Sequence, residues 1–140
     1  MEALPSFELV PPGELRDRLN AQVLSGRKTA TSRLAVMDEL AGTPAEPAGT
    51  RLRLLDSDQR PIAVIEIERV LRAPFGGIGA EVSVAEGDWM ADPASWRAAH
   101  TRYWTSMLPE IRSRLSDEGW ALTEETPVVV RFFRLIKEDQ

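Results

Sequence analysis

The strongest constraint on the fold of this chain is a set of three segments with the pattern of β-strands. Residues 61–71 (PIAVIEIERVL) alternate apolar with acidic side chains, and we expect Glu66 and Glu68 on the exposed face. Residues 50–55 alternate similarly, and the turn sequence Asp-Ser-Asp-Gln between the two segments predicts an antiparallel hairpin. Residues 126–136 (TPVVVRFFRLI) are β-branched and aromatic, which predicts a further strand. A chain with these segments must build a sheet.

Helical patterns separate the predicted strands. Apolar residues recur every four positions in residues 14–24, which predicts an amphipathic helix that ends before Gly26. Residues 28–34 are rich in β-branched and small polar residues and indicate a short strand or an irregular turn. A brief helix is expected at residues 36–40. The longest helix opens at Asp92, with aspartate as N-cap and proline at the first helical position.

Two segments rich in glycine and proline, residues 42–49 and 73–79, are expected to be loops. The second lacks both the strand–GxGxxG–helix context of a dinucleotide site and the lysine of a phosphate loop, so we exclude both kinds of site. The element order predicts an α+β fold, a small curved or partly open β-barrel flanked by helices, because three or four strands need protected edges. The length predicts one domain over residues 1–140.

Composition excludes several kinds of site and partner. With no cysteine and one histidine, the chain has no cysteine-based zinc site, thiol nucleophile or multi-histidine cluster, so we expect neither metal nor cofactor. The net charge of −5 disfavours a dedicated binder of long nucleic acid but leaves room for a local basic pocket. No apolar run approaches the about 18 residues that span a bilayer. The start MEALPSFELVPPGEL lacks the basic flank of a signal peptide, so we expect a cytoplasmic protein.

The use of lysine singles out one residue for chemistry. Only two of the seventeen basic residues are lysines, Lys28 and Lys137. Arginine cannot lose its proton, whereas a partly buried lysine can titrate into a working range. Lys28 is therefore a candidate catalytic residue. From composition alone, a surface lysine that stabilises the end of the preceding helix is the more common case.

Three further polar residues suit chemistry beside Lys28. Thr31 lies on the opposite face of an extended strand from Lys28, but a turn of the backbone between them would let the amine activate the hydroxyl. Glu86 and Asp88 lie on either side of a glycine. Either carboxyl group suits the role of general acid or general base if this segment folds against Lys28. The alternative, solvated acids at the end of a short helix, is favoured by the sequence alone.

One face of the helix that opens at Asp92 is aromatic. By the i, i+3/i+4 rule its members are Trp96, His100, Tyr103, Trp104, Met107 and Leu108. A lone histidine in such a row is more often a hydrogen-bonded packing residue than a catalyst, and the tryptophans are expected in the core. The functional alternative is that these rings stack on a base. On the strands, Arg51 and Arg53 share a face and either line a groove or meet solvent.

Residues 26–33 (GRKTATSR) form a compact polar motif, G-x-K-x-x-T-x-R, and several further features follow it in order. These are the strand pair, Pro74-Phe75, Glu86-Gly87, the W-R-x-x-H-x-x-Y motif at 96–103 and the closing strand at 128–133. In this order they resemble an ASCH domain, a member of the PUA-like fold superfamily. The resemblance covers residues 14–137, and the first motif fits the family signature without a gap.

The resemblance implies a curved barrel in which the lysine and threonine segment lines a cleft, and an association with RNA and modified bases. One branch of small bacterial ASCH proteins hydrolyses N4-acetylcytidine to cytidine and acetate. Its catalytic lysine, threonine and glutamate match Lys28, Thr31 and Glu86. The resemblance implies that Lys28 is the base or a positioning group and that Thr31 is the nucleophile on the acetyl carbonyl. Glu86 would then donate a proton to the departing amine. The implied substrate-binding residues are Arg33 (as positive charge), Gly26, Thr29, His100 and Tyr103.

The same resemblance leaves other functions open. The amidohydrolase branch lacks the long aromatic helix, so this chain resembles a neighbouring branch. Some ASCH proteins are described as ribonucleases or RNA-binding modules. The alternative to a nucleoside hydrolase is therefore a module that binds a nucleoside, a modified nucleotide or short single-stranded RNA. If it cleaves RNA, His100 is the natural proton carrier. The sequence leaves the oligomeric state open.

Overall fold

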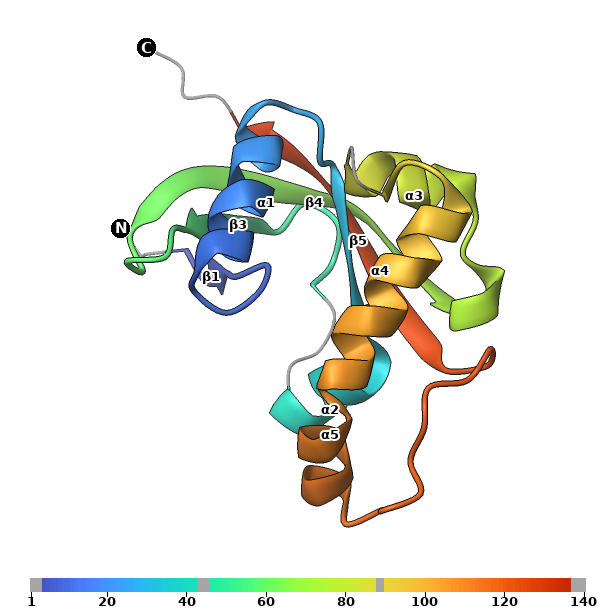
Figure 1. The fold of residues 1–140 in the computed structure, drawn as a ribbon. Coiled ribbons are helices and arrows are strands. Elements are labelled where there is room, and N and C mark those ends of the chain that lie inside the picture. Colours follow the sequence, from blue (N-terminus) through green and yellow to red (C-terminus); the bar gives the residue numbers. More distant parts are fainter. Residues whose placement is uncertain (1–3, 43–45, 88–89, 137–140) are drawn as a thin grey trace.

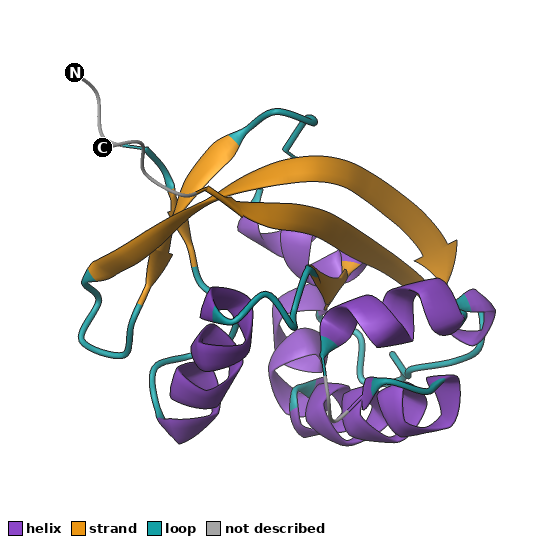
Figure 2. Cartoon of the chain, turned by 90° about the horizontal axis from the view of Figure 1, so that it is seen from above, coloured by secondary structure: helices purple, strands orange, loops and turns teal. Residues whose placement is uncertain are grey.

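In a computed structural model of the protein, the described residues are 4–42, 46–87 and 90–136. They build a five-stranded mixed sheet that does not close into a barrel, with the strand order β1-β3-β4-β5-β2. The strands are β1 (Ser6–Phe7), β2 (Ala30–Leu34), β3 (Arg51–Leu55), β4 (Pro61–Pro74) and β5 (Pro127–Ile136). Figure 2 shows the sheet as an arch with the helices gathered under its concave side. The predicted α+β fold, a small curved or partly open barrel flanked by helices, is confirmed as a five-stranded mixed sheet that stays open.

The pairing of the strands follows from the sequence only in part. The predicted hairpin forms, with β3 antiparallel to β4. The long β4 also pairs antiparallel with β5, so these two strands are the centre of the sheet. At one edge β2 pairs with β5 alone. At the other edge β1, which has two residues and was not predicted, runs parallel to β3.

The helices are α1 (Glu14–Leu24), α2 (Ala35–Ala41), α3 (Ala80–Glu86), α4 (Pro93–Ser106) and α5 (Leu108–Leu115). Three of them match predicted helices, and α3 corresponds to the short helix, given without bounds, that the favoured interpretation of Glu86 placed before it. The segment 73–79, expected as a loop, instead carries the end of β4 and a 3₁₀ helix at Phe75–Gly77. Within the described part of the chain, no helix combines the length and apolarity needed to cross a membrane.

The expected continuous face through Met107 and Leu108 is also interrupted. One helix ends at Ser106 and the next begins at Leu108, with Pro109 in its first turn. Proline has no backbone N–H, and its ring clashes with the carbonyl four residues before it, so a helix does not continue through it. It is tolerated in a first turn, where that N–H has no helical partner. The aromatic face therefore divides between two helices.

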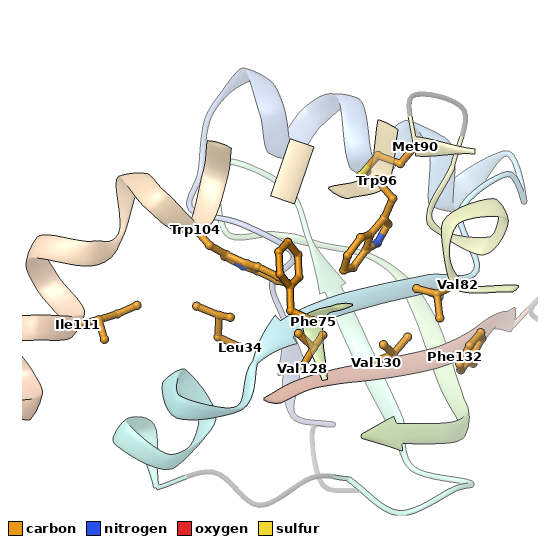
Figure 3. Close-up of a cluster of buried hydrophobic side chains, with 11 residues drawn as sticks. Leu34, Phe75, Val82, Met90, Trp96, Trp104, Ile111, Val128, Val130 and Phe132 are labelled. Atoms are coloured by element: carbon orange, nitrogen blue, oxygen red, sulfur yellow. The ribbon is translucent and has the colours of Figure 1, made fainter. Parts of the chain in front are cut away.

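Two apolar clusters hold the molecule together. The larger one lies between the sheet and α3, α4 and α5, and Figure 3 shows Phe75, Trp96 and Trp104 at its centre. Their rings contact one another with centroids 5.7 to 6.0 Å apart. The tryptophans are therefore core residues, as predicted. The smaller cluster joins α1 and β1 to β3, β4 and β5 around Ile65 and Ile67.

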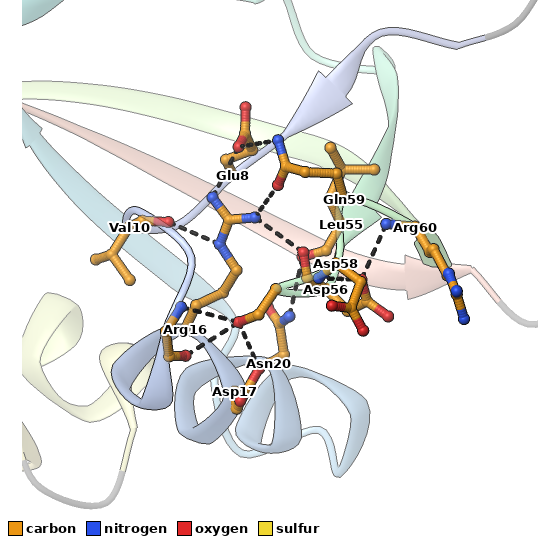
Figure 4. Close-up of polar contacts among 12 residues, drawn as sticks. Glu8, Val10, Arg16, Asp17, Asn20, Leu55, Asp56, Asp58, Gln59 and Arg60 are labelled. Carbon is orange, nitrogen blue, oxygen red and sulfur yellow. Dashed lines mark hydrogen bonds and ion pairs between the residues drawn. The ribbon is translucent and has the colours of Figure 1, made fainter.

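A buried arginine fixes α1 to the hairpin. The Arg16 guanidinium donates to the carbonyls of Val10 and Asp56 and to the side chains of Gln59 and Glu8, as Figure 4 shows. It is only 1% exposed. Because these acceptors lie in two separate segments, residues 8–10 and the turn at residues 56–59, one side chain sets the position of the helix that becomes a wall of the candidate site.

Candidate functional site

A cavity of about 280 Å³ opens between α1 and α4. In Figure 1 the edge strand β2 runs between these two helices. The lining residues are Leu9, Val10, Leu15, Arg18, Leu19, Lys28, Thr31, Ser32, Glu86, Met90, Ala99, His100, Arg102, Tyr103 and Trp104. The volume is near the lower end of the about 300–1,000 Å³ range of small-molecule sites, so the cavity suits one small molecule.

Lys28 reaches this cavity because the chain turns sharply after α1. Gly26 adopts a φ of 83°, a left-handed conformation that favours glycine. The backbone N–H of Lys28 then donates to the carbonyl of Gln22, 3.1 Å away. Its side chain is 2% exposed. The favoured interpretation of Lys28 as a surface lysine is therefore wrong, because the turn directs it into the interior.

Glu86 is the partner of Lys28 and ends α3. Its Oε1 accepts a hydrogen bond from Lys28 Nζ at 2.9 Å, and its backbone carbonyl accepts a second at 3.1 Å. The residue is 1% exposed. The interpretation of Glu86 as a solvated acid at a helix end is also wrong, although it does lie at such an end. Asp88, the other acid of this segment, lies outside the described residues.

The turn after Glu86 is tightly packed. Gly87 has a φ of 121°, and a Cβ atom on it would lie 2.1 Å from the side-chain oxygen of Gln22. Only glycine fits both the backbone conformation and the space. The same α1 residue, Gln22, thus contacts the turn before the lysine and the turn after the glutamate, which brings Lys28 and Glu86 together from positions 58 residues apart.

The second carboxylate oxygen of Glu86 accepts two more hydrogen bonds. Ser32 Oγ donates at 2.5 Å and Trp96 Nε1 at 2.9 Å. Burial raises the pKa of Glu86. The charge of Lys28, then that of His100 and these hydrogen bonds, outweigh burial and hold the pKa below its ordinary value of 4.5. Glu86 is therefore a carboxylate at neutral pH in the resting site.

His100 faces the same carboxylate. Its ring stacks on that of Trp96 with centroids 4.2 Å apart, and Nδ1 lies 2.9 Å from the Trp96 carbonyl. A carbonyl only accepts, so Nδ1 carries the proton and the neutral ring has a free lone pair on Nε2. Nε2 is 3.5 Å from Glu86 Oε2. His100 is thus both a packing residue of the core and part of the cavity lining. The sequence had raised these two positions as alternatives.

Burial lowers the pKa of His100 below its ordinary value of 6.5. The nearby Glu86 and the bond to the Trp96 carbonyl act in the opposite direction, and Lys28 adds to the lowering. The imidazole is therefore neutral at pH 7. A proton that arrives at Nε2 would find the Glu86 carboxylate beside it, so the site can accept a proton from a bound molecule or a water.

Thr31 lines the cavity with Lys28 and Glu86 and is 8% exposed. Within the described ranges, its hydroxyl forms no hydrogen bond to either of them. The hydroxyl that bonds to Glu86 belongs instead to Ser32, which was not among the predicted site residues. Strand alternation was the available signal: Ser32 shares a face with Ala30 and Leu34, which pack against the helices.

The remaining predicted binding residues divide into two groups. Tyr103 lines the cavity, and burial raises its pKa above the ordinary 10.0, with Arg33 acting slightly against that rise. The other three do not line it. Arg33 is paired with Asp38 at 3.4 Å, and Thr29 and Gly26 are exposed. Thr29 contributes through its backbone, whose N–H donates to the Ala85 carbonyl.

The strand arginines have separate roles. Arg51 and Arg53 line a second, open groove beside the hairpin, and Arg51 is paired with Glu66 at 3.0 Å. Glu66 also pairs with Arg134, and its side chain is only 20% exposed, so the expected exposed acidic face is half-covered at that position.

Among the described residues, no group of three or more histidine or acidic side chains lies close enough together to hold a metal ion.

Comparisons with known proteins agree with this fold. The model of the ASCH domain family matches residues 7–137. The crystal structure of protein EF3133 from Enterococcus faecalis, of family DUF984, superposes with a TM-score of 0.82 at 22% identity, covering 97% of this chain and 78% of that one. An ASCH domain from Lactobacillus crispatus gives 0.79 at 20% identity, covering 95% and 79%. No curated protein matches significantly. At these identities the superpositions show the fold alone.

Proposed function

Because the chain belongs to the ASCH domain family, we propose that the cavity binds an acylated pyrimidine nucleoside of the N4-acetylcytidine type and hydrolyses its amide bond. The observation that carries the proposal is the buried ion pair of Lys28 and Glu86 on the wall of a cavity that Thr31 also lines. A nucleophile, a titratable amine and a carboxyl group are the parts that acyl transfer requires.

The first half of the reaction uses the ion pair as a proton exchanger. Lys28 passes a proton to Glu86 along their 2.9 Å hydrogen bond, which leaves a neutral amine and a neutral acid. The amine takes the proton of Thr31 as its Oγ1 attacks the acyl carbonyl. The carbon–nitrogen bond then breaks, and Glu86 protonates the departing amine of the base. The products are an acyl ester on Thr31, free cytidine and the original ion pair.

In the second half, water attacks the ester. His100, which lines the cavity, takes the proton of the water at Nε2, and Glu86 stabilises the imidazolium from 3.5 Å. The ester bond breaks, the carboxylic acid leaves, and the proton returns to Thr31 Oγ1. Lysine suits the first half because arginine, which supplies every other positive side chain but Lys137, cannot give up its proton.

The test is release of cytidine from N4-acetylcytidine, followed by chromatography. Thr31→Val keeps the shape of the side chain and removes the nucleophile, so the rate should fall by at least about a hundredfold. Thr105→Val makes the same change at an exposed position of α4 outside the cavity and is the matched control. Equal rates in both variants would show that Thr31 is not the nucleophile.

A second candidate is a module that binds a nucleoside or a modified nucleotide without chemistry. It is favoured by one observation: Lys28 and Glu86 neutralise each other directly, as a structural ion pair does, and neither bonds to the Thr31 hydroxyl among the described residues. This function predicts binding of N4-acetylcytidine by the folded protein without release of cytidine on long incubation.

A further inference from the structure

The two oxygens of the Glu86 carboxylate have different surroundings. Ser32 Oγ donates to Oε2 at 2.5 Å and Trp96 Nε1 donates to the same atom at 2.9 Å, whereas Lys28 Nζ donates to Oε1 at 2.9 Å. A carboxylate only accepts, so the direction of each of these bonds is fixed. Glu86 is 1% exposed, so these side chains solvate the carboxylate in place of bulk water.

This difference decides which oxygen can take a proton. A carboxylate oxygen has two lone pairs, and two donors already occupy those of Oε2. A proton on Oε2 would displace the bond from Ser32 or the bond from Trp96. A proton that passes from Lys28 to Oε1 displaces neither of these bonds, because it moves along the hydrogen bond that joins the two atoms. Oε1 is therefore the oxygen through which Glu86 exchanges a proton.

The sheet holds Ser32 in place. Ser32 lies in β2, where it pairs with Val130 of β5, and it lines the cavity. Its neighbour Thr31 lines the cavity as well. A side chain on a paired strand is held more precisely than one on a loop. One strand thus positions both the proposed nucleophile and the hydroxyl that bonds to the proposed acid.

We propose that Ser32 is a positioning residue of this site. With the Trp96 indole, its hydroxyl keeps Oε2 of Glu86 occupied, so that Oε1 alone exchanges protons. Its part in catalysis rests on the proposed function, whereas its hold on the carboxylate does not. In the reaction, the proton leaves Lys28 Nζ for Oε1, and the amine nitrogen takes it from Oε1 as the carbon–nitrogen bond breaks. The Thr31 proton restores the lysine.

The first experiment measures kcat and KM for N4-acetylcytidine in Ser32→Ala. Without the hydroxyl, Oε2 competes with Oε1 for the proton, so kcat should fall by about 10- to 100-fold, the contribution of one hydrogen bond to a charged group. KM should change little, because the hydroxyl acts through Glu86 in the chemical step. Ser32→Thr keeps the hydroxyl and should restore most of kcat. Ser32→Cys, which keeps the volume with a weak donor, replaces the alanine variant if that variant does not fold.

Ser83→Ala is the matched control. Ser83 is also a buried serine, 0% exposed, and it lies in α3, the helix that ends at Glu86. Its hydroxyl lies within hydrogen-bond distance of the Ala80 and Ala91 carbonyls, and Ser83 is not among the described residues that line the cavity. This substitution should lower stability and leave kcat unchanged. Equal losses of kcat in Ser32→Ala and Ser83→Ala would reduce Ser32 to a structural role and overturn the proposal.

A second measurement does not depend on turnover. Carbon NMR of glutamate-labelled protein follows the Glu86 carboxyl group, whose signal is identified by its absence in Glu86→Gln. The groups that face this carboxyl are Lys28, His100, Ser32 and Trp96. A hydroxyl that donates to a carboxylate stabilises its charged form. Ser32→Ala should therefore raise the pKa of Glu86, and Ser83→Ala should leave it unchanged.

The two measurements separate this inference from the proposed function. If the wild type releases no cytidine, the proposed function fails, and the NMR titration alone decides whether Ser32 holds the carboxylate. A fall in kcat that threonine restores, together with a raised pKa of Glu86 in Ser32→Ala, supports both. If Glu86 titrates at the same pH in the wild type and in Ser32→Ala, the inference is overturned whatever the activity.

Discussion

A buried lysine is stable only when its charge is matched at hydrogen-bond distance, and Lys28 meets that condition through Glu86. The sequence pointed to Lys28 through the scarcity of lysine, and to Glu86 through the family resemblance. It could not reveal that both are buried, because their burial depends on a contact between residues 58 positions apart. Local patterns favoured solvated positions for both, since charged residues usually are solvated.

The ion pair gives a prediction for stability. Lys28→Met and Glu86→Gln should each destabilise the protein by about 3–5 kcal/mol, because each leaves a buried charge without its partner. The double variant should cost less than the sum of the two. Urea denaturation of the four proteins measures the coupling. If each single variant lowers the free energy of unfolding by less than about 0.5 kcal/mol, the ion pair is hydrated and does not have the geometry described.

His100 gives a prediction for the effect of pH on stability. Burial holds its folded-state pKa below 6.5, so the folded protein disfavours the protonated ring. The unfolded state therefore binds more protons as the pH falls below 6.5, and the free energy of unfolding decreases. The lowered pKa of Glu86 adds a second loss only below pH 4.5. Denaturation at pH 7 and pH 5 should show the first loss in the wild type.

The control for this effect is His100→Asn, whose amide can still donate to the Trp96 carbonyl. Its stability should change less between pH 7 and pH 5 than that of the wild type. An increase of stability in the wild type between pH 7 and pH 5 would contradict the account, because it would mean that Glu86 raises the pKa of His100 in the folded state.

At the scale of elements, α3 is the helix whose bounds the sequence patterns did not provide, although a short helix ending near Glu86 was expected. It has seven residues, and its buried positions are Val82, Ser83 and Glu86, two of which are polar. An apolar stripe is the main sequence signal for a helix, and α3 has none because its polar side chains find partners elsewhere in the fold. The hairpin, by contrast, was predictable because its pattern and its turn are local.

The end of α3 can be tested through its glycine. Gly87→Ala places a methyl group against the Gln22 side chain in a backbone conformation that alanine disfavours. We expect a loss of about 1–3 kcal/mol in the free energy of unfolding. Gly79→Ala, at the other end of the same helix, has open space and an ordinary φ, and should change stability little. Equal effects of the two substitutions would contradict the packing described.

At the scale of the whole molecule, the cavity lies where the two halves of the chain meet. Its walls come from α1, in the N-terminal third, and from α3 and α4, in the second half. The sequence predicted most of these elements but not their neighbours: β2 is an edge strand beside β5, nearly a hundred residues later. Such pairings are set by tertiary packing, for which a single sequence carries no local signal.

Arg16 fixes α1 to residues 8–10 and to the turn at residues 56–59, and it gives a prediction at this scale. Arg16→Met keeps an apolar stem but leaves the Val10 and Asp56 carbonyls without their donor. We expect a loss of about 2–4 kcal/mol and weaker binding of ligand at the wall formed by α1. Arg60→Gln, on the exposed turn next to this network, is the control and should leave thermal unfolding unchanged. Equal melting temperatures for the two variants would contradict the role of Arg16.

The most direct test of the central claim is the rate of cytidine release from N4-acetylcytidine by the wild type and by Lys28→Arg. The variant keeps the positive charge beside Glu86 but cannot release a proton. We predict that the wild type releases cytidine and that the rate of release by the variant is lower by a factor of about 10²–10⁴, the usual contribution of a general base. The variant should still bind cytidine. Equal rates in the two folded proteins, or no release by the folded wild type, would contradict the account.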